Sequence, residues 1–192
     1  MGFIKHGRRA PTPTIVLFAM MTSASAALAA LKDENLLTPL PDGFKVGFHE
    51  ANARQSIAEY VPKDETVDDW SRMVTAPIFY GAKNADPDVF AGNLGQKWPS
   101  ACPGGGVRKI TAGVEIGYPF SLWMVDCALN PQTRIPETMW VKAMSGADSL
   151  YSVPYAYRRA LDKELIGPAT EYLKRVSVCD ARRADRPCPA GM

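Results

Sequence analysis

The fold is decided by residues 107–157, which read VRKITAGVEIGYPFSLWMVDCALNPQTRIPETMWVKAMSGADSLYSVPYAY. The pattern predicts four short strands in a row, Val107–Ile116, Phe120–Cys127, Glu137–Met144 and Ser149–Tyr157. The breaks between them are rich in Gly, Pro, Asn and Asp, the residues that turn the backbone. Because such connections are too short for a parallel crossover, neighbouring strands should run antiparallel, and we expect a β-meander.

Three more strands are predicted upstream of the meander, at Phe44–Ala51, Arg54–Val61 and Val74–Tyr80. Pro77 would place the third of them at an edge of the sheet or at a bulge, since proline cannot donate a ladder hydrogen bond.

Capping signals predict two or three helices. Thr66 stands three residues before Asp69, which indicates a short helix over Val67–Met73. Asp86 and Pro87 begin a second helix that we expect to end at Trp98-Pro99. Asp162 caps a third, whose apolar stripe is Leu165, Ala169, Tyr172, Leu173 and Val176.

These elements predict a single α+β domain over residues 44–178, in which an antiparallel meander sheet of about seven strands is packed by two or three helices. Residues 30–43 form a proline-rich lead-in. Residues 179–192 form a basic tail that a disulfide closes.

The first 29 residues have the composition of an export signal. Lys5, Arg8 and Arg9 make a positive leader, and residues 15–21 an apolar run. Ala24-Ser25-Ala26 or Ala27-Leu28-Ala29 is the small-residue cleavage signature. We therefore expect a periplasmic or secreted protein with no membrane span after signal cleavage. Three of the 22 Lys and Arg residues lie in the leader, which leaves 19 against 20 acidic residues, so nothing in the charge favours nucleic-acid binding.

The four cysteines are an even number in a chain that carries an export signal, so disulfides are the expected state. Four cysteines allow three pairings, and we favour Cys102–Cys127 with Cys179–Cys188. A zinc site is the alternative, but the chain has no CxxC pair and His49 is the one histidine outside the leader. No metal or other cofactor is expected.

Catalytic motifs are scarce. There is no GxSxG elbow, and Gly104-Gly105-Gly106 is followed by a predicted strand without the lysine of a phosphate-binding loop. Among the acids, Asp126 is the most interesting, and if it points inward it needs Arg134, Lys142 or Arg108 as its partner. The candidates for ligand-facing residues are Trp123, Asp126, Trp140 and Tyr155, although such aromatic residues also form the core between sheet and helix.

A family resemblance rests on the order of elements and on a few motifs. The corner at Gly146-Ala147-Asp148, followed by a strand and a closing helix, resembles the PsbP/Mog1-like α+β sandwich. The segments 59–62, 66–75 and 172–179 are similar to small uncharacterised secreted proteobacterial proteins. The resemblance implies an accessory or assembly role in a larger complex and supplies no functional residue.

The leading hypothesis is therefore a non-enzymatic periplasmic binding or accessory protein of unknown ligand, with a protein partner held at one face or edge of its sheet. One alternative is a small carboxylate-dependent hydrolase of cell-envelope material, with Asp126 or Glu115 in its site. A second is a periplasmic inhibitor or immunity protein.

Overall fold

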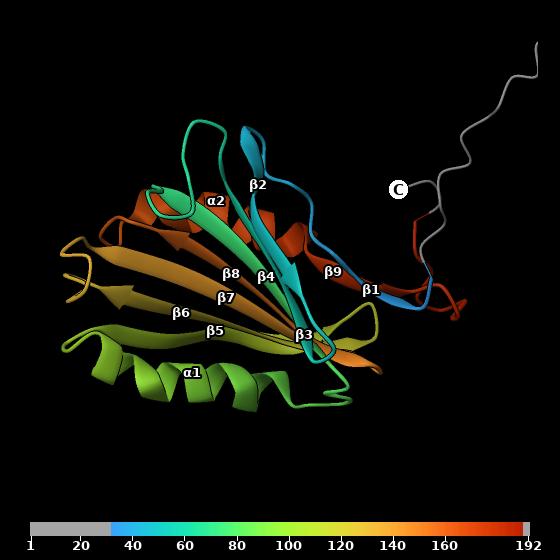
Figure 1. The fold of residues 1–192 in the computed structure, drawn as a ribbon. Coiled ribbons are helices and arrows are strands. Elements are labelled where there is room, and N and C mark those ends of the chain that lie inside the picture. Colours follow the sequence, from blue (N-terminus) through green and yellow to red (C-terminus); the bar gives the residue numbers. More distant parts are fainter. Residues whose placement is uncertain (1–31, 190–192) are drawn as a thin grey trace, which may run out of the picture.

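The computed structural model describes residues 32–189, so the predicted export signal at 1–29 lies outside the described residues. Seven antiparallel strands form one sheet in the order β2-β3-β4-β8-β7-β6-β5 (Figure 1). A second, two-stranded sheet joins β1 (Glu34–Leu37) to β9 (Ser177–Asp180). The α+β class with an antiparallel sheet of seven strands is confirmed.

The meander has the predicted strands, with ends that shift by at most two residues. They are β5 (Gly106–Glu115), β6 (Tyr118–Cys127), β7 (Glu137–Ser145) and β8 (Ser149–Tyr157). The upstream half of the sheet consists of β2 (Phe44–Ala51), β3 (Gln55–Pro62) and β4 (Arg72–Tyr80). Because β4 pairs with β8 from the far end of the meander, β5 and β2 are left as the two outer strands.

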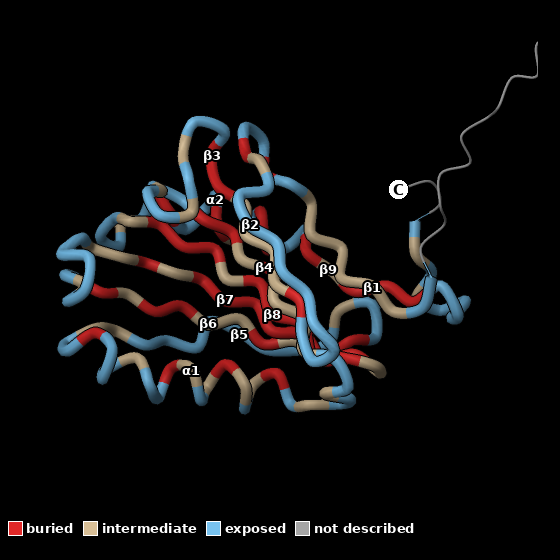
Figure 2. Tube along the Cα trace, viewed as in Figure 1, coloured by how far each residue is buried: buried red, intermediate tan, exposed pale blue. Residues whose placement is uncertain are grey.

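The two helices lie on opposite faces of the sheet (Figure 1). Helix α1 (Pro87–Ala101) contacts β5, β6 and β7, where Trp123 lies against its glycines Gly92 and Gly95. Helix α2 (Lys163–Arg175) contacts β7 and β8 on the other face. There the predicted stripe of α2, with Leu165 and Leu173, packs on the aromatic residues of β7 and β8 and forms the buried core seen in Figure 2.

Helix α1 runs past its predicted end. Asp86 caps it as expected, but the helix continues through Pro99 to Ala101. The last turn is fixed from outside, since the Trp98 indole donates to the carbonyl of Asp126 and Cys102 is bonded to Cys127. Tertiary contacts thus outweigh the helix-breaking tendency of the proline.

The predicted helix over Val67–Met73 is wrong, because residues 67–71 form an irregular loop and Arg72 already begins β4. The Thr66 hydroxyl accepts from the Asp69 amide as a cap would, yet the Thr66 amide also donates to the Asp69 carbonyl and closes a turn. Glu65 accepts from both the amide and the hydroxyl of Ser71, which fixes the loop without a helix.

Pro77 lies neither at an edge nor at a bulge, because β4 has a neighbour on each side. On the β3 side Pro77 stands opposite Ile57. On the β8 side the paired positions stop at Val74 and resume at Ile78 in the same register. Pro77 of β4 and Pro154 of β8 both lie within this interruption. Neither proline has an amide hydrogen to donate, so both stand where β4 and β8 have no paired positions.

Strands β1 and β9 were not predicted, and they change the interpretation of both ends of the domain. Part of the proposed lead-in is β1, and the proposed tail begins inside β9. Glu34 fixes β1 to the main sheet, because its carboxylate accepts from the amides of Ala147, Asp148 and Ser149 and from the hydroxyl of Tyr151.

Both favoured disulfides, Cys102–Cys127 and Cys179–Cys188, are formed. They close loops with sequence separations of 25 and 9 residues. Loop-closure entropy therefore predicts that replacing Cys102 and Cys127 by serine lowers the free energy of unfolding by about 3.5 kcal/mol, against about 2.6 kcal/mol for Cys179 and Cys188. Urea titrations of the two double variants measure the difference, and the reverse order would contradict the assignment of these loops.

The environment of Asp180, at the β1–β9 end of the molecule, predicts that the protein loses stability in acid. Hydrogen bonds from Arg182 lower the pKa of Asp180 to about 2, below its usual value of 3.8. The folded state thus favours the ionised carboxylate, and this stability is present above about pH 4 and lost as the pH falls towards 2. Unfolding free energies of the wild type and of Asp180→Asn, measured between pH 6 and pH 2, should converge as the pH falls, whereas parallel curves would refute the coupling.

Candidate functional site

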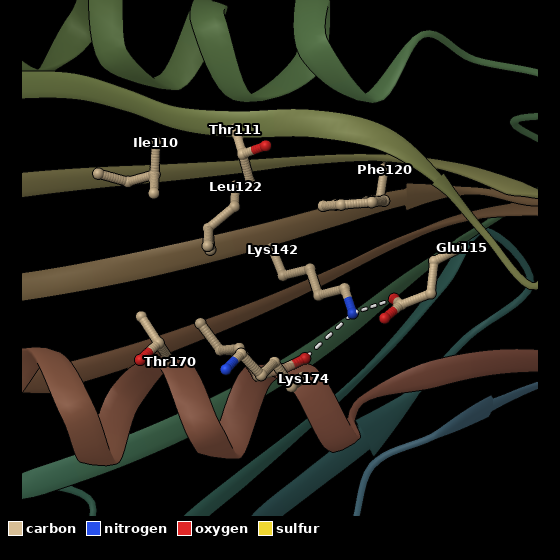
Figure 3. Close-up of a pocket in the computed structure, with 9 residues that line it drawn as sticks. Ile110, Thr111, Glu115, Phe120, Leu122, Lys142, Thr170 and Lys174 are labelled. Atoms are coloured by element: carbon tan, nitrogen blue, oxygen red, sulfur yellow. Dashed lines mark hydrogen bonds and ion pairs between the residues drawn. The ribbon is translucent and has the colours of Figure 1, made fainter.

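An apolar groove runs between α2 and strands β5 and β6 at one side of the sheet (Figure 3). It has a volume of about 320 Å³, and its floor is formed by Ile110, Phe120 and Leu122. Leu173 and the side chains of Thr170 and Lys174 form the wall on α2. The groove exists because α2 contacts β7 and β8 but leaves the outer part of this face uncovered.

A β-bulge brings Ile110 to the groove. The pairing of β5 with β6 shifts between Lys109 and Thr111, so that Ile110 has no partner on β6. A bulge bends the strand and re-aims a side chain. In consequence Lys109 lies on the α1 face, where it pairs with Asp88, whereas both Ile110 and Thr111 line the groove.

The inner end of the groove contains a buried lysine. The side chain of Lys142 is 4% exposed, and it shares its face of β7 with the core residues Trp140 and Met144. Its ammonium group donates to the carboxylate of Glu115, to the Leu173 carbonyl at 3.0 Å and to the Val176 carbonyl at 2.8 Å. It also lies 5.3 Å from the centre of the Phe120 ring.

These contacts explain how a charged group is tolerated in the core. A buried ammonium group needs acceptors for its three hydrogens and a compensating negative charge. Glu115 provides the charge, and the two carbonyls lie at the C-terminal end of α2, where the helix dipole is negative. All three donors are satisfied, so Lys142 acts as a structural cation and is not set up as a nucleophile.

The structure places Trp140 and Tyr155 in the core, not on a ligand-facing surface. They are 2% and 5% exposed and belong to the cluster beneath α2, with the Tyr155 ring 5.2 Å from that of Tyr172. Trp123 is partly buried beneath α1, and its indole donates to Ser121 and Asp88. All three aromatic side chains are thus engaged in packing or in hydrogen bonds within the fold.

Asp126 lies at the end of β6, half-buried against Gly106 of β5. Lys142, one of the three cations expected to neutralise it, is paired with Glu115 instead. The structure therefore separates the two acids proposed for hydrolysis, since Glu115 lines the apolar groove and Asp126 does not.

One hollow does contain two acids, Asp86 and Asp88, at the start of α1. Asp86 is the helix cap and accepts from the amides of Asp88 and Val89. Hydrogen bonds from Lys109 and Ser121 hold the pKa of Asp88 below its usual value, so that it stays ionised. Both carboxylates are thus engaged within the fold, and neither is prepared to act as a general acid.

Sequence reasoning missed the role of Lys142, although the pattern contains a signal. In the predicted strand Glu137–Met144, Lys142 falls on the same side as Trp140 and Met144, where a charged residue is out of place. A lysine at a core position is rare unless it is paired with an opposite charge. The position of Lys142 in the pattern therefore indicates a buried ion pair.

Within residues 32–189, no group of three or more His, Cys, Asp or Glu residues is placed to hold a metal ion. In the same range, no helix has the length and apolar character needed to cross a membrane.

Comparison with known proteins gives a likeness to solved structures only. No family model matches the sequence, and no curated protein matches it. The Saccharomyces cerevisiae Ran-binding protein Mog1p is similar in structure over 75% of this chain and 85% of its own, with a TM-score of 0.42 and 13% identity. A mutant of the protein Mog1 gives the same TM-score and 15% identity, over 71% of this chain and 78% of its own. At this level the likeness supports no inference on family or function.

The contacts of Lys142 predict a large effect of its removal on stability. Lys142→Met should lower the free energy of unfolding by about 3 kcal/mol, because Glu115 and two carbonyls lose their donor. Lys174→Met is the matched control, since this lysine lines the same groove but is 68% exposed, and it should change stability by less than about 0.5 kcal/mol. Equal effects in urea titrations of the two variants would contradict the structural role of Lys142.

Proposed function

We propose that the protein is a non-enzymatic binding or accessory protein of the periplasm, and that it holds a protein partner in the groove between α2 and β5–β6. The observation that carries the proposal is the open, almost entirely apolar groove beside an outer strand. Sites of this kind, with apolar walls and few polar groups, are the usual form of a binding site.

The surface next to the groove supports a protein as the occupant. On the outer strand β5, Ile110 is 43% exposed in the groove, whereas Val107 and Val114, at 37% and 69%, lie on the α1 side of the strand, and Ile116 just after it is 57% exposed. Apolar side chains gathered on one strand of a soluble protein mark an interaction surface. An extended segment could lie along the outer edge of β5 with an apolar side chain in the groove, as in strand addition to a sheet.

The chemistry of the groove supports binding over hydrolysis. A carboxylate mechanism needs two acids in one cleft. Among residues 32–189, Glu115 is the one acid that lines the groove, and Lys142 neutralises it. The site can therefore exclude water and accept apolar groups, but it lacks a pair of acids to divide acid and base roles.

Two disulfides support a location in the periplasm. Such bonds persist in oxidising environments such as the periplasm or the extracellular space. Together with the leader of the sequence, they support a mature protein that works outside the cytoplasm.

A matched pair of isoleucines tests the groove. Ile110 lines it at 43% exposure, whereas Ile166 is 46% exposed on α2 and does not line it. With the mature protein as bait in periplasmic extract, a protein retained by the wild type should be retained at least tenfold less by Ile110→Glu, because a charge enters the apolar floor. Ile166→Glu should retain it fully.

The retained protein is then purified and titrated against the three baits to give dissociation constants. Loss of binding in both variants, or in neither, would place the partner elsewhere on the surface. A bait that retains no protein specifically would count against the proposal itself.

A further inference from the structure

A second hollow lies on the same face of the sheet, over strands β2, β3 and β4. It has a volume of about 220 Å³. The residues that line it come from the segment after β1 and from the three strands: Leu36, Thr38, His49, Ser56, Ala58, Tyr60, Ala76 and Ile78. It shares no lining residue with the apolar groove, so the two are separate sites.

Three of the residues that line this hollow, Thr38, Ser56 and Tyr60, carry hydroxyl groups. The Thr38 hydroxyl is buried and has no hydrogen-bond partner among the described residues. Ser56 is only 8% exposed, and Tyr60, four residues farther along β3 on the same face, is half-buried. Buried hydroxyl groups are nearly always hydrogen-bonded, so the Thr38 hydroxyl has a bond left to make.

The hollow is uncharged. None of its lining residues is Lys, Arg, Asp or Glu. Burial raises the pKa of the Tyr60 phenol, which therefore keeps its proton at neutral pH and can donate. His49 is the one titratable side chain besides Tyr60, and it lies at the exposed rim. A ligand here needs no charge, but it needs several groups that both donate and accept hydrogen bonds.

The remaining wall is apolar, formed by Leu36, Ala58, Ala76 and Ile78. Hydroxyl groups on one side and aliphatic carbons on the other match a sugar ring, which carries hydroxyls on its edge and C–H groups on its face. A volume of 220 Å³ holds about seven water molecules at about 30 Å³ each, which is the size of one such ring.

We propose that the hollow lined by Thr38, His49, Ser56 and Tyr60 is a binding site for one neutral sugar unit. The ring would replace water at the Thr38, Ser56 and Tyr60 hydroxyls and place its apolar face on Ala76 and Ile78. The proposal does not depend on the apolar groove or on its partner.

Titration of the mature protein with glucose, galactose and N-acetylglucosamine, followed by NMR, tests the site. At least one of these neutral sugars should shift the ring signals of His49 and Tyr60 in a saturable way. Glucuronate should bind at least tenfold more weakly, because the hollow offers no cation for its carboxylate. Saturable binding of none of the three neutral sugars, or equal binding of glucuronate, would overturn the proposal.

Variants locate the binding. Ser56→Ala and Tyr60→Phe each remove one hydroxyl from the hollow, and each should weaken sugar binding about fivefold, the value of one neutral hydrogen bond. Tyr80→Phe is the matched control, since Tyr80 is 45% exposed at the end of β4 and outside the hollow, and it should bind as the wild type does. Circular dichroism checks that each variant is folded, and unchanged affinity in both hollow variants would refute the assignment.

Discussion

The buried ammonium group of Lys142 is the interaction on which the arrangement of this protein depends. It connects β7, the end of β5 and the last turn of α2, and none of these is adjacent to another in sequence. A desolvated charge tolerates little displacement, because each lost acceptor leaves a donor unpaired in the core. The C-terminal end of α2 is therefore held at a fixed distance from the sheet. That distance sets the width of the groove, whose floor is on β5 and β6.

The position of α2 also explains why one face of the sheet offers two unlike hollows. The helix contacts the central strands β7 and β8 and leaves both sides of the face less covered. On the β5 side the exposed floor is made of Ile110, Phe120 and Leu122, so the hollow is apolar. On the β3 side the strand carries Ser56 and Tyr60, so the hollow is polar on one side and apolar on the other. The two hollows share no lining residue.

Sequence reasoning succeeds here where structure is determined locally. The turn residues between strands, the Asp86 and Asp162 caps and the strand pattern of Ser149–Tyr157 each act within a few residues, and each gives the observed element. The failures are all tertiary. Thr66 and Asp69 favour a helix locally, but the loop around them is fixed by Glu65 and Ser71. The groove escapes prediction for the same reason, since its floor and its wall are about 50 residues apart in the chain.

The pairing of β1 with β9 has a consequence for how the chain reaches its final form. The first strand that the structure describes has no neighbour other than the last one, although Glu34 can dock on the β7–β8 turn somewhat earlier. A chain made from its N-terminus cannot complete this small sheet until residues 177–180 have been added. Closure of β1 on β9 is therefore a late step in building the domain, and a chain that stops short of β9 leaves β1 without its strand partner.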